Sequence, residues 1–181
     1  VYQWQFLEKM LRETAALYGF KEMRTPTFEE MALFKRSVGD TTDVVQKEMY
    51  QVQAEKGQDL YGLKPEGTAG AVRAAIENGL LKEALPLKIC YITPCFRHER
   101  PQAGRLREFH QFGVEMFGSQ SPSADVEVIS IAKHIFDLLG LQNISLYINS
   151  IGCPTCRAEY HKALRYLSGT VGEKSHADSG L

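Results

Sequence analysis

The chain has 181 residues, of which 44% are hydrophobic and 24% charged, and its formal net charge is −1. These values are typical of a soluble globular protein of about one domain, which can bury a core without disulfide bonds. The near-zero charge excludes binding of nucleic acid through overall positive charge, so any site for a polyanion must be a local patch. No apolar run approaches the roughly 18 residues of a membrane span, and no signal peptide is evident. We therefore expect a cytoplasmic protein with reduced cysteines and no membrane anchor.

The first half of the chain predicts two helices and three strands. They are expected, in order, as a helix at 2–18, a strand at 20–25, a hairpin of strands at 49–52 and 60–63, and a helix at 67–78. Apolar residues at helical spacing support the first helix, and Gly19 and Gly79 are placed to end the two helices. Turn-forming residues at 56–59 support the hairpin. Segment 41–50 remains ambiguous between helix and strand.

The second half continues to alternate strands with helices. We expect strands at 88–99 and 107–117, a helix capped by Ser123 and ending at Leu139, a half-buried strand at 144–148, and a last helix at about 155–167. Residues 168–181 are rich in Gly, Ser and charge, which is typical of a loop or disordered tail. Interleaved helices and strands with an antiparallel pair indicate the α+β class.

The segment from Cys95 to Glu115 holds the densest group of polar side chains. Because side chains alternate along a strand, Arg97 and Glu99 share one face. Phe109, Gln111 and Glu115 likewise share one face of the return strand. If the two faces coincide, their polar groups need a ligand, and a nucleotide with a small zwitterion would suit them. The alternative is a solvent-facing hairpin with ordinary surface charges.

Two further segments attract attention. Pro65 and Gly67 place Glu66 at the N-terminus of the helix expected at 67–78, where a carboxylate is favoured by the helix dipole. A simple helix start is one interpretation; the other is that Glu66 and Thr68 hold an α-amino group. Residues 18–28 form a helix end, a strand and Pro26, which is most simply an edge strand and possible interface.

Together these segments resemble class II aminoacyl-tRNA synthetases, and specifically the histidyl-tRNA synthetases. Residues 18–28 resemble motif 1, with Pro26 at the dimer interface, and residues 95–117 resemble motif 2 with its Arg-x-Glu hairpin. Segments 42–50, 63–68 and 97–115 are similar to the histidyl enzymes almost throughout. The resemblance covers residues 1–167 and implies an incomplete class II catalytic domain, an antiparallel sheet flanked by helices.

The resemblance also implies a role for each site residue. It assigns Arg97 to the ATP α-phosphate as the catalytic residue, Glu99 to the adenine amino group, Arg105 to the outer phosphates and Phe109 to adenine stacking. It assigns histidine binding to Glu66, Gly67, Thr68, Gln111 and Glu115, with Glu66 and Gln111 favouring the amino group and Glu115 the imidazole. The implied reaction joins histidine to ATP as histidyl-adenylate and then transfers histidine to tRNA(His). ATP as a substrate, Mg²⁺ and a homodimer come with it.

Three family features have no counterpart in the sequence: the histidyl-specific segment with a second catalytic arginine, motif 3, and the anticodon-binding domain. Losing one stabilising contact of this kind can slow a reaction about 100–1000-fold. We therefore expect a fragment that forms little or no histidyl-tRNA alone. One alternative is a non-catalytic regulatory subunit of histidine biosynthesis with the same fold. Another is a dimerisation or tRNA-contacting module without ligand affinity.

Some reactive side chains are better interpreted without a role in the site. Cys153 and Cys156 form a Cys-x-x-Cys pair, but zinc usually needs four ligands and no second pair is evident, so we assign no metal site. Alternation puts His98 and His110 on the face opposite Arg97, which excludes them from the proposed site.

Overall fold

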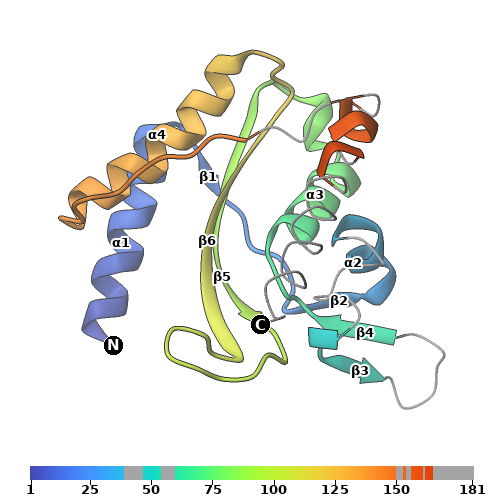
Figure 1. Ribbon diagram of the computed structural model, residues 1–181. Helices are drawn as coiled ribbons and strands as arrows, with labels where there is room; N and C mark the ends of the chain where they lie inside the picture. The colour runs from blue at the N-terminus through green and yellow to red at the C-terminus, as the bar shows by residue number, and fades with distance from the viewer. Residues whose placement is uncertain (39–46, 54–59, 150–152, 154–155, 161, 165–181) are drawn as a thin grey trace, which may run out of the picture. The chain divides into compact units, whose positions relative to one another are not determined.

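The computed structural model describes residues 1–38, 47–53, 60–149, 153, 156–160 and 162–164 (Figure 1). The chain forms two compact units, residues 1–142 and 143–181. The first unit contains nearly all of the described secondary structure and every residue of the candidate site. No helix in the described ranges is long and apolar enough to cross a membrane.

A three-stranded sheet forms the centre of the first unit, with strand order β1-β5-β6. Strands β5 (Leu87–Phe96) and β6 (Glu108–Phe117) pair antiparallel along their whole length, and Figure 1 shows them as one long curved hairpin. The short strand β1 (Lys21–Glu22) pairs parallel with β5. The sheet is thus a hairpin with one short parallel neighbour.

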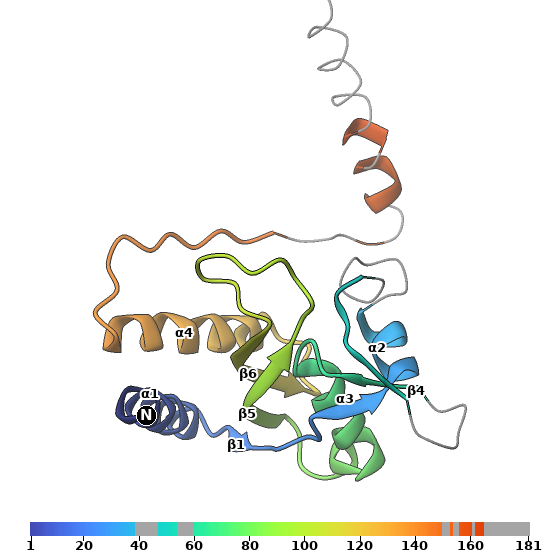
Figure 2. The ribbon, with the colours of Figure 1, turned by 90° about the horizontal axis from the view of Figure 1, so that it is seen from below.

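Two helices cover one face of this sheet. Helix α1 (Tyr2–Leu17) and helix α4 (Pro122–Leu138) lie side by side against it, as both views show (Figures 1 and 2). Their apolar faces bury a common core with the sheet, made of Met10, Leu11, Ala15, Phe20, Cys90, Ile131 and Ile135. The opposite face of the hairpin therefore remains for other contacts.

A second sheet lies in the same unit, with strand order β2-β4-β3 and antiparallel pairing throughout. Its strands are β2 (Phe28–Glu30), β3 (Gln51–Gln53) and β4 (Leu60–Leu63). Helix α2 (Met31–Val38) contacts β2 and β4, and helix α3 (Thr68–Glu77) contacts α2. The 3-10 helix η2 (Leu80–Lys82) follows α3. Met31, Leu33, Phe34, Met49 and Ala69 form its core. The chain from β4 to α3 carries the Glu66 segment to the free face of the β5–β6 hairpin.

The predicted α+β class is confirmed, as are the helices expected at 2–18 and 67–78 and the long strand pair. The strand expected at 20–25 is shorter, since only Lys21–Glu22 forms ladder pairs with β5. Strand β2 and helices α2 and η2 were not predicted, because β2 passes directly into α2 without a Gly or Pro between them. The hairpin turn at 56–59 and the tail at 168–181 lie outside the described residues.

The assignment of Ser123 as a helix cap is wrong. Ser121 is the N-cap of α4: its backbone is extended and its side chain accepts a hydrogen bond from the Ser123 N–H at 3.3 Å. Pro122 explains this assignment. Proline suits the first helical position, because the backbone N–H that it lacks would have no hydrogen-bond partner there. The preceding serine must then be the cap.

The strand expected at 144–148 is also wrong. These residues belong to the second unit and form no strand, and Ile144, Leu146 and Ile148 are 47%, 64% and 77% exposed. Alternation of apolar and polar residues favours a strand only when a neighbour supplies its ladder hydrogen bonds. Residues 156–160 and 162–164 are helical, within the helix expected at 155–167; its other residues lie outside the described part of the chain.

Candidate functional site

The face of the β5–β6 hairpin turned away from α1 and α4 carries the candidate site. The register pairs Cys95 with Phe109, Thr93 with Gln111 and Tyr91 with Gly113. Because side chains alternate, these residues and Glu115 point to the same side. Arg97 follows directly after β5 and contacts the same side, with its guanidinium carbon 5.2 Å from the centre of the Phe109 ring.

The segment between β4 and α3 lies across this face and is tied to it by three hydrogen bonds. The Gly67 N–H donates to Gln111 Oε1 at 3.0 Å, and Arg97 Nε donates to the Pro65 carbonyl at 3.0 Å. The Phe96 N–H donates to the Lys64 carbonyl at 2.9 Å. Residues far apart in the sequence therefore meet on one surface. Strand alternation predicted that the side chains of Arg97, Phe109, Gln111 and Glu115 would share this face.

Glu66 caps helix α3 with both of its carboxylate oxygens. One oxygen accepts from the Thr68 N–H at 2.5 Å and the other from the Ala69 N–H at 2.9 Å. This arrangement fulfils the helix-start interpretation. It does not consume the carboxylate, since an ionised carboxylate has about four acceptor positions. Glu66 is half-buried beside the Gln111 contact, where it can still accept from a ligand.

Beyond the hairpin, a cluster of charges surrounds Glu99. Its carboxylate lies 3.8 Å from Arg97 Nη1 and 3.3 Å from Arg105 Nη1. The Glu99 side chain is 19% exposed, whereas that of Arg105 is 65% exposed. These side chains and Phe109 line an open cavity of about 580 Å³. Glu48 lines it as well, so the cavity combines two cations, two carboxylates and an aromatic ring.

Tyr91 is the residue of this face that the sequence reasoning missed. Its hydroxyl donates to Glu115 Oε1 at 3.1 Å and lies 3.3 Å from the Thr68 hydroxyl. Burial, followed by the effects of nearby carboxylates, raises the pKa of the Tyr91 phenol well above its ordinary value. The sequence did indicate its face, because Tyr91 lies six residues before Arg97 and side chains an even number of residues apart point to the same side of a strand.

Two ionisable groups lie beneath the site. Burial raises the pKa of the Cys95 thiol to about 11, while Lys64 and Arg97 act in the opposite direction. Burial lowers the pKa of the Lys64 ammonium, whose Nζ donates to the Thr25 carbonyl at 3.2 Å. Lys64 thereby links the segment after β1 to the segment that carries Glu66.

The Cys95 thiol predicts a pH dependence of stability. Its folded pKa of about 11 exceeds the ordinary value of 9.0, so its contribution is complete below pH 9 and is lost as pH rises toward 11. The unfolding free energy of the chain, relative to a Cys95→Ala variant, should fall across this window by about 2–3 kcal/mol. Urea unfolding at several pH values measures it. Cys153→Ala, at an exposed thiol, is the control and should run parallel to the parent chain. A Cys95→Ala difference that is constant with pH would contradict the prediction.

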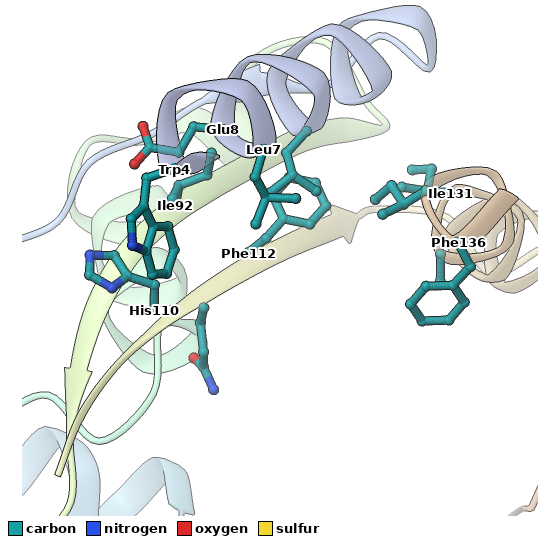
Figure 3. Close-up of a pocket in the computed structure, with 12 residues that line it drawn as sticks. Trp4, Leu7, Glu8, Ile92, His110, Phe112, Ile131 and Phe136 are labelled. Atoms are coloured by element: carbon teal, nitrogen blue, oxygen red, sulfur yellow. The ribbon is translucent and has the colours of Figure 1, made fainter. Parts of the chain in front are cut away.

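The two histidines of this hairpin lie in different surroundings, and His110 borders both the cavity around Glu99 and the α1 side of the sheet, so alternation alone does not exclude it from the site. His110 lies on the α1 side of β6, where its ring is 4.9 Å from that of Trp4 (Figure 3). Both residues line a mainly apolar groove of about 370 Å³ with Leu7, Phe112, Ile131 and Phe136. The His98 ring packs edge-on against Tyr50 at 5.3 Å.

The remaining expectations concern Pro26 and the cysteine pair. Pro26 is exposed between β1 and β2. In the second unit, the sulfur atoms of Cys153 and Cys156 are 3.1 Å apart and form no disulfide. Within the described ranges, no group of three or more His, Cys, Asp or Glu side chains is arranged to hold a metal ion.

Comparison with known proteins identifies the family. The family model described as "Histidyl-tRNA synthetase" matches residues 2–154. The chain belongs to the histidyl-tRNA synthetase family. It is 57% identical over 164 residues to the histidine--tRNA ligases of Clostridioides difficile (strain 630) and of Thermoanaerobacter pseudethanolicus. Each match covers 91% of this chain but 39% of the relative, so the chain spans about two fifths of the length of these synthetases.

Solved structures agree with this family assignment. The apo histidyl-tRNA synthetase of S. aureus matches 94% of this chain and 40% of its own, with a TM-score of 0.72 and 36% identity. A Bacillus halodurans protein described as an ATP phosphoribosyltransferase regulatory subunit/histidyl-tRNA synthetase gives a TM-score of 0.63 and 27% identity over 76% of this chain. Pyrrolysyl-tRNA synthetase from Desulfitobacterium hafniense, 20% identical with a TM-score of 0.67, shares the fold. The class II synthetase fold expected from the sequence is thus confirmed.

Proposed function

We propose that this chain supplies the ATP- and histidine-binding part of a histidine--tRNA ligase, an enzyme of protein biosynthesis. The observation that carries the proposal is the joining of the Glu66 segment to the motif 2 hairpin, through Gly67 to Gln111 and Arg97 to Pro65. These bonds bring the polar side chains around Glu66 and Gln111 close to the cavity lined by Arg97 and Arg105. A histidine carboxylate and an ATP α-phosphate could therefore be held next to each other.

In the nucleotide cavity, Arg97 is proposed to hold the α-phosphate, because a guanidinium can donate two parallel hydrogen bonds to phosphate oxygens. Its Nε is fixed by Pro65, which orients the group before the ligand arrives. Phe109 offers a ring for adenine, Glu99 an acceptor for the adenine amino group, and exposed Arg105 a cation for the outer phosphates. Reaction then requires positioning and charge neutralisation, with no side-chain nucleophile.

In the histidine pocket, Glu66 and Thr68 are proposed to hold the α-amino group and Glu115 an imidazole N–H. Gln111 adds a polar group between them. Its carbonyl oxygen already accepts from the Gly67 N–H, which leaves its NH₂ group to donate. A donor suits the ligand's carboxylate better than its amino group. We therefore propose that Gln111 faces the carboxylate, in place of the amino group that the family resemblance implies for it.

Mg²⁺ is proposed to accompany ATP. The described residues offer no cluster of three metal-binding side chains, so they supply no dedicated cage. Mg²⁺ commonly binds through substrate phosphates with one or two carboxylates, and this mode needs no such cage. The ion would neutralise phosphate charge beside Arg97 and Arg105, while these two side chains orient the phosphates.

We also propose a cytoplasmic homodimer that acts on tRNA(His) when the whole synthetase is present. Exposed Pro26, between β1 and β2, would lie at the subunit interface, and Phe28 beside it is 54% exposed. Sedimentation equilibrium of the chain at the mass of two copies would support the dimer, and the mass of one copy would oppose it.

The regulatory-subunit alternative is not favoured. One solved structure with this fold carries both descriptions in its title, so the fold alone does not separate them. The convergence of Arg97, Glu99 and Arg105 beside Phe109 supports the ligase, because these side chains suit a bound ATP.

Calorimetric titration of the chain with histidine and with ATP tests the proposal. We expect saturable binding of both ligands at a ratio of one per chain. Because the chain spans about 39% of the length of its relatives, we expect little or no histidyl-tRNA from it alone. Histidine binding without ATP binding would favour the regulatory alternative, and binding of neither would leave only a structural module. Ready formation of histidyl-tRNA would refute the fragment interpretation.

A further inference from the structure

Tyr91 lies at the junction of the two ends of the proposed histidine pocket. On one side its hydroxyl reaches the Thr68 hydroxyl at 3.3 Å, and on the other it donates to Glu115 Oε1 at 3.1 Å. The three groups form a continuous hydrogen-bonded row from the start of α3 to β6. No other side chain on the described part of this face is seen to connect Thr68 with Glu115.

The Tyr91 ring is held by its neighbours as well as by its hydroxyl. A Cβ atom added at Gly67 would lie 2.2 Å from the ring, and one added at Gly113 would lie 2.3 Å from it. Two glycines therefore leave room for the ring and press against it, and only 6% of Tyr91 is exposed. Such a ring has little freedom to move, so its hydroxyl is a fixed donor.

A fixed donor matters because of what it does to the carboxylate of Glu115. A carboxylate beside a neutral phenol accepts one hydrogen bond on one oxygen, and its second oxygen stays an acceptor. A ligand with an N–H donor completes the pair, whereas an isosteric ring without one leaves a half-buried carboxylate oxygen unpaired. The site thereby selects a ring N–H by penalising its absence.

We propose that Tyr91 is a positioning residue that fixes the Glu115 carboxylate, and so sets the pocket's preference for an imidazole over an isosteric ring without N–H. This inference rests on the proposed histidine site and deepens it. Tyr91 is not proposed to touch the reacting atoms. It acts through Glu115, and this indirect action is what an experiment must detect.

The test is a double-mutant cycle on ligand selection. Affinities for histidine and for β-(2-thienyl)alanine, a ring analogue without N–H, are measured by calorimetry for the parent chain, Tyr91→Phe, Glu115→Gln and the double variant. Tyr91→Phe keeps the ring between the two glycines and removes only the hydroxyl. We expect histidine affinity to fall about 10-fold, thienylalanine affinity to change less than about 2-fold, and ATP affinity to stay the same. The double variant should lose little more than Glu115→Gln, because Tyr91 acts through Glu115.

Tyr61→Phe is the matched control, since Tyr61 lies in β4 of the other sheet and its ring contacts Phe28. It should leave both affinities unchanged. Equal losses for both ligands in Tyr91→Phe, or additive losses in the double variant, would overturn the positioning role while the histidine site stands. A parent chain that binds neither histidine nor ATP would overturn the proposed function, and this inference with it. Should Tyr91→Phe fail to fold, Thr68→Val supplies the second variant. It leaves the Tyr91–Glu115 hydrogen bond intact, so we expect it to preserve the preference for histidine over thienylalanine. For Glu115→Gln, an unchanged ratio of the two affinities would refute the proposal.

Discussion

Replacement of Arg97 by alanine is expected to weaken ATP binding about 10–100-fold. The guanidinium is oriented by the Pro65 carbonyl at 3.0 Å and lies over the Phe109 ring, so a phosphate meets a donor pair that is already in place. Hydrogen bonds to charged groups contribute about 1.5–3 kcal/mol, which corresponds to that range of affinity. Calorimetric titration with ATP at one fixed salt concentration measures the change.

The same substitution should also reduce histidine affinity, by a smaller factor. The Arg97–Pro65 bond is one of the ties that hold the Glu66 segment against the hairpin, and alanine removes it. Arg97→Lys preserves the charge but not the planar fork, so its ATP affinity should fall between those of the parent chain and the alanine variant.

Arg105→Ala is the internal control for this prediction. Its side chain is 65% exposed and pairs with Glu99 at 3.3 Å, and exposed ion pairs contribute little. We expect ATP affinity to fall no more than about 5-fold, since exposed contacts are worth about 1 kcal/mol or less. A larger effect at Arg105 than at Arg97 would show that the phosphates lie toward the loop and would contradict the proposed placement.

Much of this face could be predicted from the sequence because the strand period is strictly two residues. Arg97 and Glu115 share a surface through strand alternation alone, once the hairpin between them is accepted. Helix α3 was equally accessible, since alanine-rich sequence and Gly79 define its body and its end. These features depend on residues close together in the chain.

What could not be predicted depends on contacts between distant segments. Strand parity puts Tyr91 on the face of Arg97, but its role there could not be predicted, because it looks like a core residue until Thr68, from another element, is placed against its hydroxyl. The parallel pairing of β1 with β5 has the same origin, because nothing within residues 21–22 specifies their partner. The alternation of apolar and polar residues at 144–148 predicted a strand that does not form. The pattern is present in the sequence, but no partner strand pairs with it among the described residues.

Replacement of Gly113 by alanine is expected to lower the melting temperature of the chain by about 4–10 °C. An alanine in an extended strand is normally favourable by about 0.4–1 kcal/mol, because it restricts the unfolded chain. At this position its Cβ would lie 2.3 Å from the Tyr91 ring, which cannot withdraw because Gly67 presses on it too. Overpacking of this kind costs about 1–3 kcal/mol or more, and for a chain of this size each kcal/mol corresponds to about 2–4 °C. Differential scanning calorimetry measures the shift.

Gly140→Ala separates this steric effect from the general effect of adding a methyl group. Gly140 has a φ of +68° and nothing within 4 Å of an added Cβ, so alanine there meets only the backbone strain of the left-handed region, about 1 kcal/mol. It should lower the melting temperature slightly and leave histidine affinity unchanged, whereas Gly113→Ala should weaken histidine binding as well, by moving Tyr91 away from Glu115.

The decisive comparison is made in a Tyr91→Ala background, where the ring is gone. There Gly113→Ala should become neutral or stabilising, because the three atoms nearest to its Cβ all belong to the Tyr91 side chain and have been removed. If the substitution stays equally destabilising without the ring, the glycine serves the backbone of β6 and not the placement of Tyr91.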